Sequence, residues 1–523
     1  MEETDVILLW GSNARETHPI FFHHVLKAVR RGAKLYVIDP RRTSSAEWAD
    51  AWLPLDVGSD IALANAVANC ILEQQLENRS FIEKATSGFD AYQASVQRYD
   101  LTRAARETRV DPKLIRQMAR DYARADRAII CWTLGITEHH NAVDNVFALI
   151  NLALLTGHVG KWGSGLNPLR GQNNVQGGGD MGALPNRLPG FQDLEDAGVR
   201  QKFEAAWGHP IPPKSGWHLT EMFEAMEHGK LTALQVIGEN PAQSEAESKR
   251  ALALLSKLEC LIAQDIFLTK TAEMADVVLP ASASWCECEG TVTSSERRVQ
   301  RVKKALDPPG QARDDIDILC DLSRRLGFEM GSPTAEQAWD EMRSNSPMHR
   351  GMSYARLEQL QGIQWPCTDE NDPGSPFLHG RLWKDPIEGA RAPFQVVEFE
   401  PPVDELSPQF PLRLTTGRRL ASFNTGVQSS SYAWPPGRGE TIDLSPRDAV
   451  QAGVGNGERV RVISRRGAVE APVRVDPALR PGLAFMTIHF PDEVDTNVLT
   501  IDATDPKSGT AEFKASAIRV EKI

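Results

Sequence analysis

The chain has 523 residues and a formal net charge of −12, with 41% hydrophobic and 24% charged residues. This length allows several domains, and the composition is ordinary for a soluble globular protein. The acidic balance argues against general nucleic-acid binding, which needs a basic surface. No apolar run reaches the roughly 18–20 residues of a membrane span. We therefore expect a multidomain protein with no nucleic-acid partner and no membrane span.

The cysteines and the N-terminus indicate a reduced compartment. There are seven cysteines, an odd number, and they are scattered along the chain, so a disulfide framework is not expected. Only Cys286 and Cys288 lie close together, and their spacing is not the CxxC spacing of a metal site. The N-terminus lacks the basic and apolar regions of a signal peptide. These features predict a cytoplasmic protein.

Strands and helices alternate over the first third of the chain. Thr17 is a plausible N-cap, with Pro19 in the first turn of the helix that follows. An α/β fold is the prediction that follows from this alternation. The expected strands are 5–10, 35–38, 51–54 and 128–132, and the expected helices are 18–31, 61–74, 112–123 and 142–155.

A set of landmarks occurs twice: an apolar run ending in a Gly turn, a second run ending in Asp, and then Ala-Asp and Leu-Pro. The distance from the glycine to the first acid is 28 positions in one copy and 27 in the other. The two acids lie 11 positions apart in both copies. We interpret this as one α/β unit used twice. The landmarks are Gly11, Asp39, Asp50 and Pro54 in the first copy, and Gly238, Asp265, Asp276 and Pro280 in the second.

Each copy has the pattern of a nucleotide site. Backbone N–H groups at a helix start after a small-residue turn favour a phosphate, and an acid after the next strand suits a ribose or a base edge. Two copies predict two nucleotide moieties, or one large ligand with two arms. The alternative is an α/β fold in which Gly and Asn only make turns.

Residues 165–180 have neither helical nor strand periodicity. The segment is rich in glycine and amides around one arginine, Arg170. Consecutive glycines let the backbone approach a ligand, and amide side chains supply donors and acceptors. We predict a ligand-binding loop here; the alternative is a flexible linker.

Two further regions complete the chain. Arg297 and Arg298 follow Glu296, and this pair could hold phosphates or a carboxylate or form a solvated ion pair with Glu296. Residues 302–375 are expected to be helical and then irregular, and the stretches 460–463, 468–475 and 483–489 are β-rich. The predicted domains are two α/β domains at 1–172 and 173–284, a connecting region at 285–375, and a β-barrel at 376–523.

Several of these motifs together resemble the molybdopterin oxidoreductases, and specifically the formate dehydrogenase α subunits, over the whole chain. They are Trp10-Gly-Ser-Asn13, Arg170-Gly-Gln-Asn-Asn-Val-Gln-Gly177, Gly238-Glu-Asn-Pro241, Thr291…Glu296-Arg-Arg-Val-Gln-Arg301 and Asp505-Pro…Glu512-Phe-Lys514. The resemblance implies a C-terminal double-psi-like barrel and a bis(molybdopterin guanine dinucleotide) cofactor carrying molybdenum, or sometimes tungsten. It also implies formate as substrate and electron-transfer partner subunits.

The resemblance assigns cofactor contacts to matching positions in each domain. Those of the first α/β unit are Gly11, Asn13, Glu16, Asp39, Arg41, Gly58 and Asp60, with Leu134, Gly135 and Glu138 reaching the pterin. Those of the second unit are Gly238, Asn240, Ser244, Gln264, Asp265 and Ser282. Those of the barrel are Gly417, Arg418, Leu420, Asn424, Asn497, Phe513 and Lys514.

Arg170 is the expected catalytic residue. In the family the matching arginine holds the carboxylate of formate, and a planar guanidinium can grip a carboxylate through two bonds. Formate then loses two electrons and a proton to give carbon dioxide. Gln172 and Asn173 would hydrogen-bond the pterin or the substrate.

The chain departs from the family pattern at its start. The four-cysteine motif for a 4Fe-4S cluster and the Cys- or Sec-His pair that serves the metal have no match here, so no metal ligand is assigned. Ser422 and Asn424 stand where two histidines are common. We expect a truncated formate dehydrogenase α subunit, from a selenocysteine codon read as stop, a frameshift or a separate gene.

Three other functions stay open at this point. Another oxidoreductase of the superfamily, such as a nitrate reductase, would share most of the motifs. A non-catalytic cofactor-binding module would fit the missing metal ligand. An NAD-dependent dehydrogenase with two Rossmann units is disfavoured because neither turn has the full GxGxxG pattern.

Overall fold

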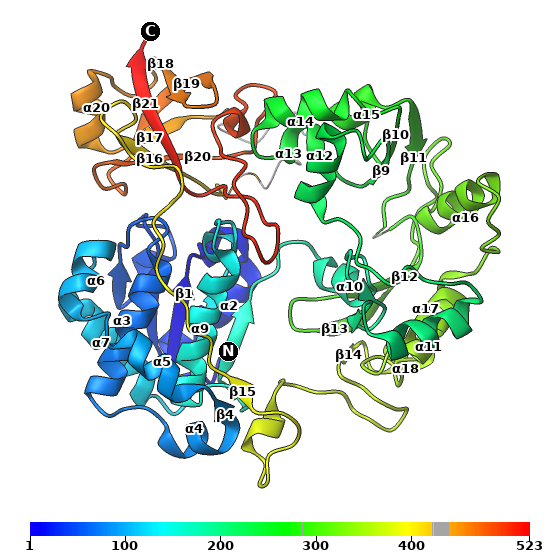
Figure 1. The fold of residues 1–523 in the computed structure, drawn as a ribbon, viewed down its shortest axis with the longest axis horizontal. Helices are drawn as coiled ribbons and strands as arrows, with labels where there is room; N and C mark the ends of the chain where they lie inside the picture. The colour runs from blue at the N-terminus through cyan, green and yellow to red at the C-terminus, as the bar shows by residue number, and fades with distance from the viewer. Residues whose placement is uncertain (285, 421, 423–438) are drawn as a thin grey trace. The chain divides into compact units, whose positions relative to one another are not determined.

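The computed structural model describes all residues except 285, 421 and 423–438. The described residues form two compact units (Figure 1), each with its own parallel sheet. The first unit comprises Met1–Leu169, Gln243–Arg250 and Phe377–Ile523, and the second comprises Arg170–Ala242 and Ala251–Pro376.

The first unit contains a five-stranded parallel sheet with the order β3-β2-β1-β5-β6. Every residue of the central strand β1 is buried, as expected for a parallel strand covered on both faces. The predicted strands of this region are confirmed. They are β1 (Val6–Trp10), β2 (Lys34–Ile38), β3 (Ala51–Leu53), β5 (Ala128–Trp132) and the additional edge strand β6 (Gly165–Pro168).

Helices cover both faces of this sheet. Leu8 and Trp10 of β1 belong to the core that includes α3, α7 and α9, whereas Ile7 and Leu9 pack with α2 on the other face. The predicted helices are confirmed to within about a residue. The helices are α1 (Ala14–Thr17), α2 (Pro19–Arg30), α3 (Asp60–Glu73), α4 (Arg79–Ala85), α5 (Phe89–Val96), α6 (Leu101–Thr108), α7 (Pro112–Arg124), α8 (Leu134–Thr137) and α9 (Ala142–Thr156).

The predicted N-cap at Thr17 is wrong. Thr17 is the last residue of the short helix α1, and its hydroxyl donates to the carbonyl of Asn13 at 3.1 Å. His18 precedes α2, and Pro19 occupies the first position as expected. The extra turn forms because the chain becomes helical directly after the Gly11 turn.

A closed six-stranded barrel forms the C-terminal part of the first unit, with the order β16-β20-β17-β19-β18-β21, which confirms the predicted β-barrel. Apolar residues such as Leu414, Val460 and Ile518 fill its interior. The expected strand 483–489 ends at Met486, because Thr487 bonds to Glu440 instead. The elements are β16 (Leu412–Thr416), β17 (Ile442–Leu444), α20 (Pro446–Ala452), β18 (Arg459–Ser464), β19 (Ala468–Val475), β20 (Leu483–Met486), η3 (Thr496–Val498) and β21 (Ser516–Lys522).

The segment between the second unit and the barrel, from Phe377 onward, runs along the first α/β sheet and its helices. The side chain of Asn151 on α9 donates to the carbonyl of Gln395 at 2.6 Å and accepts from its N–H at 3.1 Å. Phe394 stacks on Tyr92 at 4.8 Å. The segment contains η2 (Gly380–Trp383) and β15 (Ala392–Pro393), which pairs with β4 (Thr86–Ser87).

The second unit contains a three-stranded parallel sheet with the order β11-β10-β9 and an antiparallel sheet β12-β13-β14. Its remaining part is helical and then irregular, as expected for 302–375. The strands are β7 (Arg187–Leu188), β8 (Gln192–Asp193), β9 (Ala233–Ile237), β10 (Cys260–Asp265), β11 (Val277–Pro280), β12 (Gly290–Thr293), β13 (Arg298–Val302) and β14 (Ile363–Gln364). The helices are α10 (Val175–Asp180), α11 (Ala197–Trp207), α12 (Leu219–Glu227), α15 (Lys270–Met274), α16 (Asp315–Arg325), α17 (Ala335–Asn345) and α18 (Tyr354–Gln359), and α13 (Pro241–Ser244) and α14 (Ser248–Leu255) span the boundary between the units.

Residues 165–180 are more ordered than the sequence predicts. They begin as strand β6 and end as helix α10. β6 was not predicted because this edge strand pairs through its backbone and does not need alternating apolar and polar side chains. α10 contains three consecutive glycines, so no apolar stripe marks it.

The two parallel sheets have equivalent internal hydrogen bonds as well as an equivalent order of three strands. In the first copy Asn13 Oδ1 accepts from Ser45 Oγ at 2.8 Å, and in the second Asn240 Oδ1 accepts from Thr271 Oγ1 at 2.8 Å. The turn glycines Gly11 and Gly238 both have positive φ, +57° and +62°. The structural repeat therefore extends to individual side-chain contacts.

The second acid of each copy also has the same role. Asp50 Oδ2 accepts from the backbone N–H of Leu35 at 2.8 Å, and Asp276 Oδ2 accepts from that of Leu261 at 2.8 Å. Each carboxylate thus accepts a hydrogen bond from the second residue of the neighbouring strand, β2 in the first sheet and β10 in the second.

We predict that Asp50→Ala and Asp276→Ala each lower the free energy of unfolding by about 1 kcal/mol, because each removes one hydrogen bond to a backbone donor. Asp50→Asn and Asp276→Asn keep an acceptor and serve as matched controls with smaller losses. Urea unfolding of the four variants measures this. A large loss in one copy and none in the other would contradict the equivalence of the two sheets.

Candidate active site

The carboxyl end of the first sheet gathers most of the predicted cofactor residues of the first unit. The turn after β1 is fixed by its amide, since Asn13 Oδ1 accepts from Ser45 Oγ. Glu16 Oε1 accepts from Ser44 Oγ at 2.8 Å. The loop after β2 is thereby held against the turn after β1, at the sheet edge where α/β proteins bind ligands.

A buried acid and a half-buried arginine follow β2. Asp39 Oδ1 accepts from the backbone N–H of Arg41 at 2.9 Å. Burial raises the pKa of Asp39, although the charge of Arg41 opposes this, and burial lowers the pKa of Arg41. The Arg41 guanidinium lies 3.6 Å above the ring of Phe485 from the barrel. A Cβ at Gly417 would come within 2.9 Å of that ring, so a glycine is needed beside this stack.

Gly11 and Gly135 bring the ends of β1 and β5 unusually close. Gly135 N donates to Gly11 O at 3.2 Å, and Thr133 Oγ1 donates to the same oxygen at 2.7 Å. A Cβ at Gly135 would lie 2.6 Å from Gly11 O. Only glycine allows this contact, which leaves the exposed Leu134 beside the turn.

A buried carboxylate joins the loop after α8 to the C-terminal tail. Glu512 Oε2 accepts from the backbone N–H of His140 at 3.1 Å and lies 3.2 Å from His139 Nδ1. Its other oxygen accepts from the backbone N–H of Lys514 at 2.9 Å. The Lys514 ammonium in turn pairs with Glu138 at 2.7 Å. Two predicted cofactor residues, Glu138 and Lys514, are thus held face to face.

Burial alone would raise the pKa of Glu512, but the charge of His139 and the hydrogen bonds to both histidines lower it well below its usual value of 4.5. Burial opposes the charged form of His139, yet Glu512 raises the pKa of that imidazole above its usual 6.5. The pair is therefore an ion pair with no exposed atoms on Glu512.

Other predicted residues of the first unit have clear structural partners. Phe513 N donates to the carbonyl of Glu138 at 3.2 Å. Arg418 donates to the carbonyls of Ser422 at 2.8 Å and of Thr17 at 3.3 Å, and burial lowers its pKa. Leu420 is 61% exposed. Asn424 lies outside the described residues.

Gly58 and Asp60 lie at the start of α3, in the core. A Cβ at Gly58 would come within 2.8 Å of Pro402. Asp60 accepts from Trp10 Nε1 at 2.8 Å, and burial raises its pKa to about 6. The contacts of both residues are with the protein itself, so their part in cofactor binding stays a prediction.

The second sheet presents its predicted residues in the same way. Gln264 is 1% exposed and donates to Asp315 at 2.6 Å. Asp265 accepts from the backbone N–H of Phe267 at 3.0 Å, as Asp39 does from Arg41, and burial raises its pKa. Ser282 donates to Asp314 at 2.8 Å. With Gly238 and Asn240, these residues form a counterpart of the first turn.

Ser244 and Asn497 meet within the first unit. The Asn497 side chain donates to the carbonyls of Gln243 and Ser244, both at 3.2 Å. The 243–250 segment is held by the barrel through these bonds and through Ser248, which donates to Asp495 at 2.6 Å.

The Arg170 loop belongs to the second unit. Arg170, Gln172 and Asn173 are all exposed. Arg170 follows Pro168, the last residue of β6, by two positions. The carbonyl of Arg170 accepts from Ser295 Oγ at 3.5 Å, and Asn174 Oδ1 accepts from the backbone N–H of Thr293 at 2.9 Å. The loop is thereby attached to β12.

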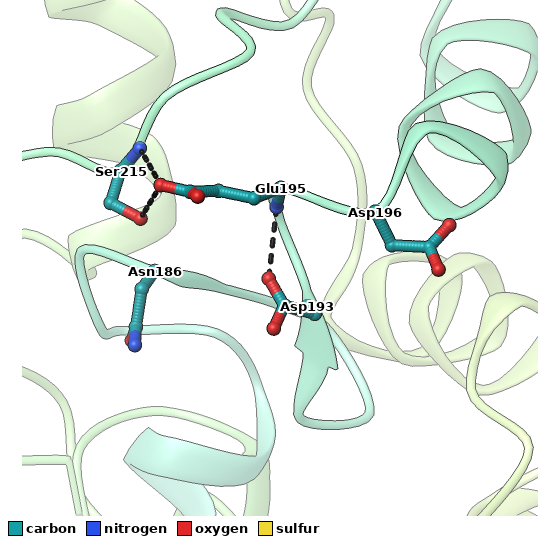
Figure 2. Close-up of a pocket in the computed structure, with 5 residues that line it drawn as sticks. All are labelled: Asn186, Asp193, Glu195, Asp196 and Ser215. Carbon is teal, nitrogen blue, oxygen red and sulfur yellow. Dashed lines mark hydrogen bonds between the residues drawn. The ribbon is translucent and has the colours of Figure 1, made fainter.

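One pocket of the second unit contains none of the residues of this loop. A cavity of about 450 Å³ is lined by Asn186, Asp193, Glu195, Asp196 and Ser215 (Figure 2). Glu195 accepts from both the N–H and the hydroxyl of Ser215, and Asp196 caps α11. These carboxylates stabilise local turns. Among the residues that the structure describes, no cluster of three or more His, Cys, Asp or Glu side chains could hold a metal ion.

Two residues at the site were not predicted. Ser45 could have been found, since it corresponds to Thr271 in the second copy. Phe485 gave no local signal, because its partner Arg41 lies hundreds of positions away in the chain. Glu512 belongs to a motif of the family, but its contact with His139 was not predicted, because the two residues are also far apart in the chain.

The first unit suits an anionic dinucleotide. Ser12 Oγ and Thr43 Oγ1 are buried and make no hydrogen bond within the described part of the chain. Such donors at a strand–helix turn are typical of phosphate sites, and the stacked Arg41 adds a positive charge. The residues present therefore fit a large phosphate-bearing cofactor.

Two family models match the chain. Residues 1–325 match Molybdopterin oxidoreductase, and residues 412–517 match the molybdopterin dinucleotide binding domain. The chain belongs to the molybdopterin oxidoreductase family. It is accordingly an oxidoreductase with a molybdopterin cofactor, and no helix among the described residues has the length and apolarity to span a membrane.

Several relatives of this oxidoreductase match over its whole length. The chain is 40% identical to the F420-dependent formate dehydrogenase subunit alpha of Methanocaldococcus jannaschii, covering 100% of this chain and 77% of the relative. It is 36% identical to formate dehydrogenase H of Escherichia coli, covering 100% of this chain and 73% of the relative. It is also 32% identical to the assimilatory nitrate reductase catalytic subunit of Bacillus subtilis, covering 99% of this chain and 74% of the relative.

The fold is shared with a solved structure. Acetylene hydratase from Pelobacter acetylenicus superposes with a TM-score of 0.75 at 21% identity, covering 100% of this chain and 78% of that chain. This likeness confirms the α/β architecture of the oxidoreductase with its C-terminal barrel.

The ion pair at the barrel predicts a pH dependence of stability. The contribution of Glu512 is complete above about pH 4.5 and is lost as the pH falls through its lowered pKa. The contribution of His139 is complete below about pH 6.5 and is lost as the pH rises through its raised pKa. The pair therefore stabilises most between these two values.

We predict that Glu512→Gln removes this maximum and lowers stability most in that window. Denaturant midpoints measured from acid to alkaline pH test this, with the exposed Glu405→Gln as control. Parallel pH curves for the wild type and Glu512→Gln would contradict the assignment.

Proposed function

We propose that this molybdopterin oxidoreductase oxidises formate to carbon dioxide, at a molybdenum centre carried by two molybdopterin guanine dinucleotides. The observation that carries the proposal is Arg170 in an amide-rich loop attached to β12 by Asn174 and Ser295. Similarity to a formate dehydrogenase subunit alpha of Methanocaldococcus jannaschii, at 40% identity, and to formate dehydrogenase H of Escherichia coli, at 36% identity, supports it.

The two repeated sheets support a cofactor with two nucleotide arms. We assign the first arm to the turn of Asn13 and Glu16 with Asp39 and Arg41. The other contacts of this arm are Gly11, Gly135, Glu138, Phe513 and Lys514. The second arm is assigned to the equivalent turn: Gly238, Asn240, Gln264, Asp265 and Ser282. Asn13 and Asn240 accept equivalent hydrogen bonds. We therefore expect the two turns to bind equivalent nucleotide groups.

The reaction converts one formate anion into carbon dioxide, one proton and two electrons. When bound, the molybdenum centre supplies the acceptor for those two electrons. The Arg170 guanidinium binds the substrate carboxylate through two parallel hydrogen bonds and so fixes its orientation. Gln172 and Asn173 supply further hydrogen bonds to the substrate or the pterin.

The electrons and the metal complete the assignment of the site. Because two relatives are named as α subunits, we propose that electrons leave through partner subunits in the cytoplasm. Tungsten can replace molybdenum in this assignment, and elemental analysis of the purified holoenzyme distinguishes the two.

We predict that Arg170→Lys lowers kcat/KM for formate roughly 10- to 100-fold, because lysine cannot make the paired contact to a carboxylate. Cofactor content should stay near that of the wild type. Steady-state kinetics with an artificial electron acceptor, together with metal and pterin analysis, measures both quantities. Arg350→Lys, at an exposed arginine of the same unit, is the matched control. Loss of cofactor with unchanged turnover per cofactor would contradict the role of Arg170.

Nitrate reduction is the second candidate, because the B. subtilis nitrate reductase subunit matches 99% of the chain. The same preparation, given nitrate and a reduced dye, decides between the two. Nitrate turnover without formate oxidation would favour the second candidate. A protein that retains its cofactor and turns over neither anion would be a cofactor-binding module.

A further inference from the structure

The internal repeat gives each strand of the second parallel sheet a counterpart in the first (Figure 1). β9, β10 and β11 correspond to β1, β2 and β3, because their turn glycines and acids align. The backbone bonds agree with this alignment. In the first sheet Gly11 N donates to Ile38 O at 2.8 Å. In the second Gly238 N donates to Gln264 O at 2.9 Å. The surroundings of the two sheets can therefore be compared position by position.

β9 has a free edge where its counterpart has a neighbour. β1 lies between β2 and β5, whereas β9 lies at the end of its sheet and pairs with β10 alone among the described strands. Successive backbone groups of a strand point alternately to its two sides. Thr232 O and Gly238 N bond to β10, so the odd-numbered residues between them face the other way. The free edge presents the N–H and C=O groups of Ala233, Gln235 and Ile237.

The first sheet shows what occupies this edge. Val6 is the counterpart of Ala233, and its N–H donates to the carbonyl of Arg127, directly before β5, at 3.2 Å. β1 and β5 then pair in parallel over their whole length. An unpaired edge of this kind is a template for a further strand. The missing neighbour of β9 is therefore a parallel strand in the place of β5.

One face of the second sheet is also uncovered. Leu234, on the other face, packs with α12 and α14. The register places Ile237 and Val277 on the uncovered face, where they are 46% and 44% exposed. Their counterparts in the first sheet are Trp10, which is fully buried, and Ala51, which packs against the core that includes α3, α7 and α9. Because parallel sheets are covered on both faces, a helix is missing here as well.

Other parts of the chain occupy the remaining boundaries of the second sheet. Next to the end of β11, Arg313 N donates to Pro280 O at 3.1 Å. At the carboxyl end of the uncovered face, Asp315 of α16 accepts from Gln264 at 2.6 Å. What is left is the edge of β9 and the exposed side chains of the same face. This open side comprises Ala233, Gln235, Ile237 and Val277.

The relatives contain enough further sequence to fill the open side. The match covers 77% of the M. jannaschii subunit and 73% of the E. coli enzyme, so about a quarter of each has no counterpart in this chain. Acetylene hydratase, which shares the fold, is covered to 78%. A strand with its crossover helix takes about 30 residues or somewhat more, which is well within that length.

We propose that the open side of the second sheet binds a separate α/β polypeptide, which adds a parallel strand along β9 and a helix over the uncovered face. The added strand bonds to β9 as β5 bonds to β1. It is apolar throughout, as β5 is, because it is buried on both faces. The added helix presents an apolar stripe to Ile237 and Val277.

A second copy of this chain does not fit the open side. A two-fold axis would pair β9 with itself in antiparallel fashion, whereas the equivalent edge of β1 takes a parallel strand. It would also bring no helix to the uncovered face. The inference does not depend on which anion the oxidoreductase turns over.

The test titrates the full chain with one probe, the part of the M. jannaschii F420-dependent formate dehydrogenase subunit alpha that lies outside the match, produced as a separate polypeptide. We expect a one-to-one complex by light scattering. Ala233→Pro should weaken binding about 3- to 10-fold, because it removes one donor at the free edge and none of the bonds to β10. Ala233→Ser keeps the donor and is the matched control, with unchanged binding.

A second pair of variants tests the face. Val277→Lys should weaken binding at least about tenfold, because the ammonium group would be covered by the added helix. Val450→Lys, at an exposed valine of α20 in the barrel, should have no effect. Binding that neither Ala233→Pro nor Val277→Lys weakens would overturn the inference. A folded probe that does not bind would also overturn it, as would a dimer of the chain alone that Ala233→Pro dissociates.

If the probe does not fold, amide hydrogen exchange of the chain alone provides the test. The N–H groups of Ala233, Gln235 and Ile237 should exchange much faster than those of Leu234 and Val236, which point to β10. Protection of all five N–H groups in the monomeric chain would overturn the inference, because the edge would then already be occupied.

Discussion

The candidate site of the first unit depends on one buried carboxylate. Glu512 binds the backbone of His140 with one oxygen and that of Lys514 with the other, so it joins the α/β sheet to the barrel tail. A buried charge is tolerated only when it is paired and hydrogen-bonded, and His139 provides that pairing. Removing the carboxylate would leave the imidazole charge and two backbone donors without their acceptor. The placement of Glu138 and Lys514 follows from this contact.

The repeat shows how one scaffold supports two sites of different character. The amide of the turn and the acid that precedes β3 or β11 make the same hydrogen bonds in both sheets. The surroundings differ: two positions after Asp39 stands Arg41, stacked on Phe485, whereas two positions after Asp265 stands the partly exposed Phe267. The turn geometry is thus shared, while the charge offered to a ligand is not.

Much of the first sheet and its helices could be predicted because their residues follow short periods in the sequence. The turns at Gly11 and Gly238 could be predicted because the same landmarks follow both glycines at nearly equal spacing. The Thr17 cap was wrong because α1 intervenes, and α10 was missed because three glycines carry no pattern. The contacts of Glu512 and of Arg41 could not be predicted, since they join residues that are close only in the folded chain.

The path of the chain has a consequence for biosynthesis. Residues 243–250 are held by the loop around 492–502, through Asn497, Ser248 with Asp495, and Arg250 with Asp502. About half of the polypeptide is therefore synthesised between the two halves of this contact. During synthesis residues 243–250 emerge before the residues that bind them. Contacts between residues so far apart in the chain form slowly, and partly folded states are exposed until they form. The first unit can close around residues 243–250 only after residues 492–502 have been synthesised.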